Sequence, residues 1–302
     1  MAPAPKRRQC GTQQVNERLC EQVYGLRERQ NRIEEGIRRS ITTGEAQRVT
    51  RQLITIPVVV HVVHKTEEEN IPDEQVESQI DALNRDYRLR NDDKSAIPSA
   101  WQGLATDANI EFALATKDPS GKQTSGITRT KTARASFGTG DSVKTKTGGG
   151  HPPWPGNRYL NLWTCNLSDG LLGYAQFPGG PAKTDGVVIF YTAFGTSGAA
   201  QRPFDLGRTA THEVGHWLNL RHIWGDRNDC GGSDFVGDTP NAQLPNYGKP
   251  KFPHISCNNG PNGDMFMNYM DYVDDAAMTM FTAGQVARMN ATLAGPRKKI
   301  GR

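Results

Sequence analysis

The chain has 302 residues, of which 35% are hydrophobic and 23% are charged, so one sizeable catalytic domain with an appendage fits its length and composition. It contains no run of about 18 apolar residues, which excludes a typical transmembrane helix. The formal net charge of +4 lies in residues 1–50, where 10 Lys and Arg face 6 Asp and Glu; the remainder balances at 26 and 26, so no nucleic-acid-binding surface is expected.

The first segment of the chain, residues 1–50, is rich in helix-forming residues between Glu17 and Arg39. Few of these residues are large and apolar, so we expect the segment to be an accessory that does not fold alone. Residues 1–5 lack the apolar core of a secretory leader, so any leader has been removed or the first Met is engineered.

Alternating strand and helix patterns follow. The first strand is expected at 53–63, and an amphipathic helix at 73–89 carries Val76, Ile80, Leu83 and Tyr87 on one face. Further strands are expected at 109–115, 158–164 and 186–191. This order predicts an α/β fold with a twisted mixed sheet.

The next predicted helix, residues 205–219, has Asp205 as its expected N-cap. Its apolar residues, spaced for one buried face, are Ala210, Val214, Trp217 and Leu218. With this face buried, the opposite face of the helix, which carries the histidines, would point toward a cleft.

That helix carries the most informative motif of the chain, His212-Glu213-Val214-Gly215-His216, followed by His222. His212 and His216 lie one turn apart and can reach one ion, whereas Glu213 is offset by about 100° and suits a base for a metal-bound water. His222 can join them only if the helix ends before it, and Asn219 can enter the left-handed conformation that ends a helix. The alternative for the five-residue motif alone is a helix with two surface histidines.

The region after Asn219 has little periodicity up to a final helix at about 282–293. A long irregular stretch of this kind needs tethers, and Asp234, Asp238 and Thr239 offer the hard oxygens that calcium prefers. The alternative is an Asp-rich, solvated turn. We expect an upper subdomain at about 51–219 and a lower one at about 220–302, with the substrate cleft between them.

Several motifs together resemble the pappalysin family of metzincin proteases. The histidine motif extends to His222 with Asn219 where metzincins usually have glycine. Residues 268–272, Asn-Tyr-Met-Asp-Tyr, are similar to the family's methionine turn, and residues 56–63 and 170–178 also look like the family. A Met-rich run alone would be ordinary core filling.

The resemblance implies roles for further residues. Met270 would lie beneath the zinc, and Tyr272 would donate a hydrogen bond to the oxyanion, its alternative being a core tyrosine. Residues 8–12, Arg-Gln-Cys-Gly-Thr, look like a latency motif in which the Cys10 thiolate takes the fourth zinc position; otherwise Cys10 is an unpaired thiol. Residues 1–50 would then be an inhibitory propeptide and residues 51–302 the catalytic domain, with activation by cleavage close to Arg51.

The family also implies a disulfide between Cys230 and Cys257 and calcium at Asp234 and Thr239. Cysteines of a second family disulfide, near Lys249 and Ala277, are absent. Relatives prefer Arg or Lys after the cleaved bond through an acidic residue where this chain has alanines, and Asp274 or Asp275 could substitute for it. Cys165, on a strand, is expected to be a buried apolar thiol.

The sequence therefore predicts a secreted, latent, zinc-dependent endopeptidase. Its ligands would be His212, His216 and His222, its general base Glu213, and its partners protein or peptide substrates and its own propeptide, without nucleic acid or membrane. The alternative is a zinc-stabilised binding protein of the same fold without turnover. The presence of Glu213, for which we find no structural need, argues against this alternative.

Overall fold

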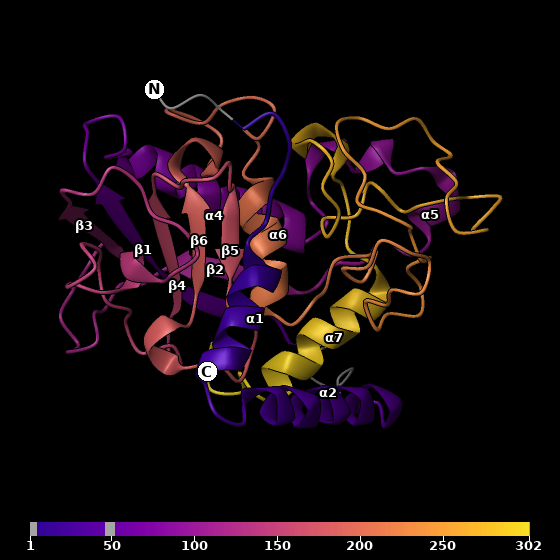
Figure 1. Ribbon diagram of the computed structural model, residues 1–302, viewed down its shortest axis with the longest axis horizontal. Coiled ribbons are helices and arrows are strands. Elements are labelled where there is room, and N and C mark those ends of the chain that lie inside the picture. Colours follow the sequence, from indigo (N-terminus) through magenta and orange to yellow (C-terminus); the bar gives the residue numbers. More distant parts are fainter. Residues whose placement is uncertain (1–4, 46–51, 302) are drawn as a thin grey trace.

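The computed structural model describes residues 5–45 and 52–301. In Figure 1 the sheet lies at the left and a largely irregular region, coloured orange to yellow, lies at the right. No helix in the described parts of the chain is long and apolar enough to cross a bilayer.

The sheet has six strands in the order β2-β1-β4-β6-β5, and β3 also pairs with β1. All pairs are parallel except β5 with β6, so the predicted mixed sheet is confirmed. The strands are β1 (Ile54–His64), β2 (Ile110–Leu114), β3 (Ile127–Lys131), β4 (Leu160–Cys165), β5 (Gly173–Ala175) and β6 (Val187–Phe190). The short strands β3 and β5 were not expected from the sequence.

The central strand β1 is buried over most of its length. Its residues 58–63 are all buried, because the strand has neighbours on both edges and packing on both faces. The side chain of Cys165 on β4 is also fully buried, and burial raises the pKa of its thiol, as expected for an apolar core position.

Helices α4 (Asp73–Tyr87) and α6 (Arg208–Trp217) pack against each other, α4 contacting β2 and α6 contacting β5 and β6. The other helices described after β1 are α5 (Ser99–Gln102), α7 (Ala283–Ala294) and the 3₁₀ helices η1 (Asp92–Ala96), η2 (Ser142–Lys144), η3 (Ala182–Thr184), η4 (Tyr191–Ala193) and η5 (Asp275–Ala277). Thr282 and Gln285 form a capping box that begins α7.

The N-terminal segment forms two helices, α1 (Thr12–Gln22) and α2 (Leu26–Thr42), separated at Gly25 by a left-handed φ of 70°. Helix α1 contacts β5, whereas α2 lies along α7 (Figure 1). The expected boundary of the propeptide, around residues 50 and 51, lies outside the described residues.

The start of the histidine helix differs from the prediction. Helix α6 begins at Arg208, and its N-cap is Gly207 rather than Asp205. The amides of Leu206 and Arg208 donate instead to the buried carboxylate of Asp275, at 2.8 and 3.3 Å. A carboxylate from a distant part of the chain therefore accepts the hydrogen bonds at the start of α6 that a local N-cap side chain was expected to accept.

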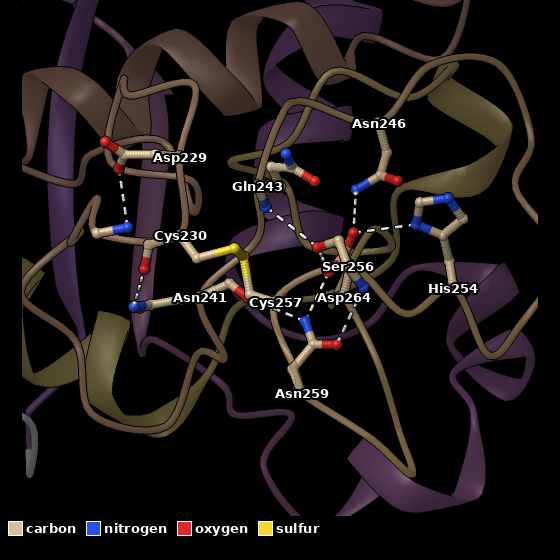
Figure 2. Close-up of a disulfide and its surroundings, with 11 residues drawn as sticks. Asp229, Cys230, Asn241, Gln243, Asn246, His254, Ser256, Cys257, Asn259 and Asp264 are labelled. Carbon is tan, nitrogen blue, oxygen red and sulfur yellow. Dashed lines mark hydrogen bonds and ion pairs between the residues drawn. A yellow bond between two sulfur atoms is a disulfide. The ribbon is translucent and has the colours of Figure 1, made fainter.

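The irregular region is held by the predicted disulfide between Cys230 and Cys257 (Figure 2). Beside it, the buried carboxylate of Asp264 accepts hydrogen bonds from Ser256 Oγ and Asn259 Nδ2, both at 2.6 Å. The disulfide and this carboxylate tie together loops that contain few regular hydrogen bonds of their own.

Candidate metal centre

The end of α6 turns the chain as the sequence predicted. Asn219 has a φ of 71°, in the left-handed region. Its amide donates to the His216 carbonyl at 2.8 Å, and the Leu220 amide donates to the Gly215 carbonyl at 2.9 Å. These two bonds form a Schellman motif, which directs the following residues, including His222, back toward the helix.

The three histidines meet at one point. The Nε2 atoms of His212, His216 and His222 lie 3.0 to 3.2 Å apart, and all three residues are buried. Each Nδ1 has an oxygen acceptor: the Tyr269 carbonyl for His212, the Leu220 carbonyl for His216 and the Asp226 carboxylate for His222.

This arrangement fits zinc. With each Nδ1 donating its proton, the three Nε2 lone pairs point at one another, and no hydrogen remains to bridge them. Nitrogens at the usual zinc–nitrogen distance in a tetrahedral site stand about 3.3 Å apart, close to the spacing found here. Burial, followed by the neighbouring imidazoles, also lowers the pKa of His212 and lowers that of His216 to about 3, which keeps both rings neutral.

Cys10 lies at the open side of the histidines. Its sulfur and the three Nε2 atoms all lie within 4.8 Å of one another. The backbone around Cys10 pairs in parallel with β5: Gly11 N donates to Gly173 O, and Leu172 N donates to Gln9 O, both at 2.9 Å. The N-terminal segment thus joins β5 through an isolated parallel bridge at Cys10, beside the centre.

Glu213 faces the same point from α6. Its Oε2 accepts hydrogen bonds from Thr12 Oγ1 at 2.8 Å and from Cys10 Sγ at 3.3 Å. Burial raises the pKa of Glu213 to about 7, although both hydrogen bonds lower it. A carboxyl group that titrates near neutrality can both accept and return a proton.

Met270 and Tyr272 also lie at the centre. A Cβ on Gly215 of α6 would lie 2.6 Å from Met270 Sδ, so the methionine packs directly against the histidine helix. The Tyr272 ring is 4.9 Å from the His222 ring, and its hydroxyl donates to the Cys10 carbonyl at 3.5 Å.

Beside the histidines, the buried guanidinium of Arg8 has three polar partners, one of them acidic. Its Nη2 donates to Asp275 Oδ1 at 2.6 Å, its Nη1 to Thr209 Oγ1 at 3.0 Å and its Nε to the Val273 carbonyl at 3.2 Å. Asp275 is fully buried, whereas Asp274 is partly exposed, and partial burial raises the pKa of Asp274. Of the two acids considered from the sequence, Asp275 is the one that binds the guanidinium.

The residues considered for calcium are also neighbours. Asp234 Oδ2 accepts a hydrogen bond from Thr239 Oγ1 at 2.7 Å, and Asp234 Oδ1 accepts one from the Val236 amide. Asp238 faces elsewhere, since its carboxylate accepts from Thr282 Oγ1 and the Gly284 amide at the start of α7.

Two features of the centre were missed from the sequence. The first is Asp226, which accepts from His222 Nδ1 and lies four residues after that histidine. Histidines that bind zinc often donate their second ring N–H to a carboxylate, so a nearby acidic residue was the available signal. The second is Asn246, which donates to both oxygens of Asp271 at 2.9 Å and to Asp264 at 3.4 Å, linking the disulfide region to Tyr272. No local sequence pattern indicates this link.

The chain is similar in sequence to known proteins. Residues 150–294 match the model of the peptidase family M43, described as pregnancy-associated plasma protein-A. An extracellular metalloprotease of Arthroderma otae is 32% identical over 243 residues, which are 78% of this chain and 76% of the relative. An extracellular metalloprotease of Verticillium alfalfae is 43% identical over 141 residues, 44% of this chain and 48% of the relative.

Solved structures are similar over more of the chain. A promirolysin variant of Tannerella forsythia superposes with a TM-score of 0.88 and 48% identity, covering 97% of this chain and 96% of that one. Mature mirolysin of Tannerella forsythia with a cleaved peptide has a TM-score of 0.80 and 53% identity, covering 82% and 95%.

The fold, the histidine centre and these relatives define a secreted zinc metalloendopeptidase of the metzincin class, made as a zymogen. Within that class, the chain belongs to the pappalysins, the peptidase family of pregnancy-associated plasma protein-A.

Proposed function

We propose that His212, His216 and His222 hold the catalytic zinc and that Glu213 is the general base of peptide-bond hydrolysis. Zinc, when bound, acidifies a water molecule and polarises the peptide carbonyl. As the water oxygen bonds to the peptide carbon, Glu213 would take its proton and return it to the amine nitrogen when the C–N bond breaks, while the Tyr272 hydroxyl would donate to the former carbonyl oxygen. The convergence of three Nε2 lone pairs beside a buried carboxyl group is the observation that carries this proposal.

The latent state would depend on Cys10. Its sulfur and the three Nε2 atoms lie within 4.8 Å of one another, so the thiolate would take the zinc position that catalysis needs for water, and Glu213 accepts hydrogen bonds from Thr12 and Cys10. Residues 1–50 are therefore proposed to be the inhibitory propeptide and residues 51–302 the catalytic domain. A cut near Arg51 would begin activation.

For the substrate, we propose a preference for Arg or Lys after the cleaved bond. Arg8 of the propeptide supports this preference, because its guanidinium is bound by Asp275, Thr209 and the Val273 carbonyl close to the histidines. A buried carboxylate selects a cationic side chain, since an apolar one would leave that charge unpaired.

A structural calcium ion at Asp234 and Thr239 is a further proposal. The two oxygens are neighbours, and burial raises the pKa of Asp234 to about 6, so a cation there would relieve the cost of ionising the carboxylate. Backbone carbonyls would have to complete the coordination, because the described residues gather three or more metal-binding side chains only around the histidines.

The proposal for the base is tested with Glu213→Gln in the activated enzyme. Loss of the base should lower hydrolysis of a casein-like substrate by roughly 10²- to 10⁴-fold. Zinc content, measured by elemental analysis, should stay the same because Glu213 is no ligand. Activity close to that of the unaltered enzyme would reject Glu213 as the base.

A further inference from the structure

Helix α2 contacts the catalytic domain at α7, a place other than the histidine centre. It lies along α7 at the lower edge of the molecule in Figure 1, whereas α1 lies against β5. The isoleucines that face α7 recur every four residues, at Ile33, Ile37 and Ile41. Ile37 is buried against Ala291 of α7. Through this stripe, α2 packs against α7 by apolar contacts.

An ion pair next to this stripe fixes α2 to the lower subdomain. Glu34 accepts two hydrogen bonds from Arg288, at 2.7 Å to Oε1 and 2.8 Å to Oε2. The Arg288 side chain is 2% exposed and that of Glu34 is 25% exposed, so the pair is largely shielded from water. A two-pronged, shielded pair of this kind is stronger and more specific than a surface ion pair.

The same carboxylate also reaches the end of the histidine helix. Asn219 Nδ2 donates to Glu34 Oε2 at 3.4 Å, and Arg288 Nη2 donates to the Asn219 carbonyl at 3.3 Å. Asn219 is the residue whose left-handed conformation directs the chain toward His222. Glu34 thus contacts the point where the upper and lower parts of the protein join.

The catalytic domain is cationic at this place. Arg288 and Arg221 both lie over the ring of Phe235, at 5.8 and 5.0 Å, so two guanidinium groups meet here, and Glu34 is paired with Arg288. Glu34 therefore offsets a repulsion between two guanidinium groups. The site is complementary to an amphipathic helix with an acidic residue beside its apolar stripe.

We propose that α7, Arg288 and Asn219 form a docking site that binds α2 independently of the histidine centre, so that the propeptide has two separate anchors. This inference deepens the proposed zymogen function. Because α1 connects α2 to Cys10, binding of α2 keeps the thiol at a high local concentration even after the chain is cut. A cut between Glu45 and Gln52 then leaves the fragment bound, and activity appears only when α2 dissociates.

The experiment uses the full-length chain with a recognition sequence for a site-specific protease inserted between Glu45 and Gln52. After complete cleavage, size exclusion measures how much N-terminal fragment co-elutes, and dilution gives its dissociation rate. We expect the cleaved chain to retain its fragment and its latency. Glu34→Gln should release the fragment at least tenfold faster, and the matched control Glu35→Gln, at an exposed neighbour, should not.

Equal release rates for Glu34→Gln and Glu35→Gln would overturn the docking site. Ile37→Ala provides a second variant of the same contact, should Glu34→Gln prevent folding, and the same faster release is expected from it. Cys10→Ala separates this inference from the thiol switch. If Cys10→Ala leaves latency unchanged, the thiol switch is wrong. The docking site is still supported in that case if the unaltered chain releases its fragment more slowly than Glu34→Gln does.

Discussion

The two carboxylate oxygens of Asp275 accept hydrogen bonds from different parts of the protein. One carboxylate oxygen receives the amides at the start of α6, and the other receives Arg8. The helix that carries two of the histidines is therefore positioned by the same side chain that is proposed to select the substrate. A change at Asp275 should affect specificity more than it affects the chemistry on a neutral substrate.

We predict that Asp275→Asn lowers kcat/KM for peptides with Arg after the cleaved bond by roughly 10- to 100-fold, the value of a hydrogen bond to a charged group. The control Asp274→Asn should change it little, because Asp274 is partly exposed and lies outside the Arg8 contacts. Peptides with Leu at the same position serve as the internal standard. An equal loss on Arg and Leu peptides would contradict the assigned specificity.

Among single residues, the sequence could predict those whose role follows from spacing along one helix or turn. His212, His216 and Asn219 are such residues, because helical geometry alone relates them. Asp205 was wrong as the N-cap because a buried carboxylate 70 positions along the chain, at Asp275, takes its place. Contacts between distant segments, such as Asn246 with Asp271, leave no local pattern to find.

Among the elements, α6 makes a close contact with the methionine turn, residues 268–272. Gly215 lies where Met270 Sδ approaches the helix, and the Ile223 amide donates to the Met270 carbonyl at 3.4 Å. The turn therefore supports both the helix and the segment that carries His222.

Gly215→Ala should destabilise the catalytic domain by about 1 to 3 kcal/mol, because the new methyl group would overlap the sulfur of Met270. Gly103→Ala is the matched control, since no atom lies within 4 Å of its added Cβ. Denaturant-induced unfolding of both variants measures the difference. A Gly215→Ala protein as stable as the control would show that the turn is not packed as described.

The sequence predicted the long elements well, since β1, α4 and α7 lie within two residues of their expected ends. Strand β5 was missed because it has only three residues, and β3 was missed because Ile127 is its one large apolar residue. The break between α1 and α2 was missed as well, although Gly25 was a possible signal.

Considered as a whole, the molecule has an ordered sheet subdomain and a lower region whose shape depends on cross-links. The disulfide, the Asp264 hydrogen bonds and the histidine centre replace regular secondary structure there. Residues 104–106 also join this region, pairing with residues 281–283 beside α7. Stability of the lower region should therefore respond to ions more than that of the sheet.

Calcium should raise the melting temperature more at pH 7.5 than at pH 5. Protons and calcium compete for Asp234, whose pKa burial raises to about 6, so stabilisation by calcium is fully present above that pKa and is lost as the pH falls through it. Melting curves with zinc held constant, with and without calcium chloride, measure the effect. Asp234→Asn should abolish it and the partly exposed Asp118→Asn should not; a calcium effect that survives in Asp234→Asn would place the ion elsewhere.

The central claim is that three imidazoles bind one zinc ion on which all peptidase activity depends. Elemental analysis of the purified, unchelated protein, beside that of His216→Ala, tests it most directly. We predict about one zinc per chain in the unaltered protein, and zinc and hydrolysis lost together in the variant. A fully active protein without stoichiometric zinc, or a variant that retains both, would contradict the account.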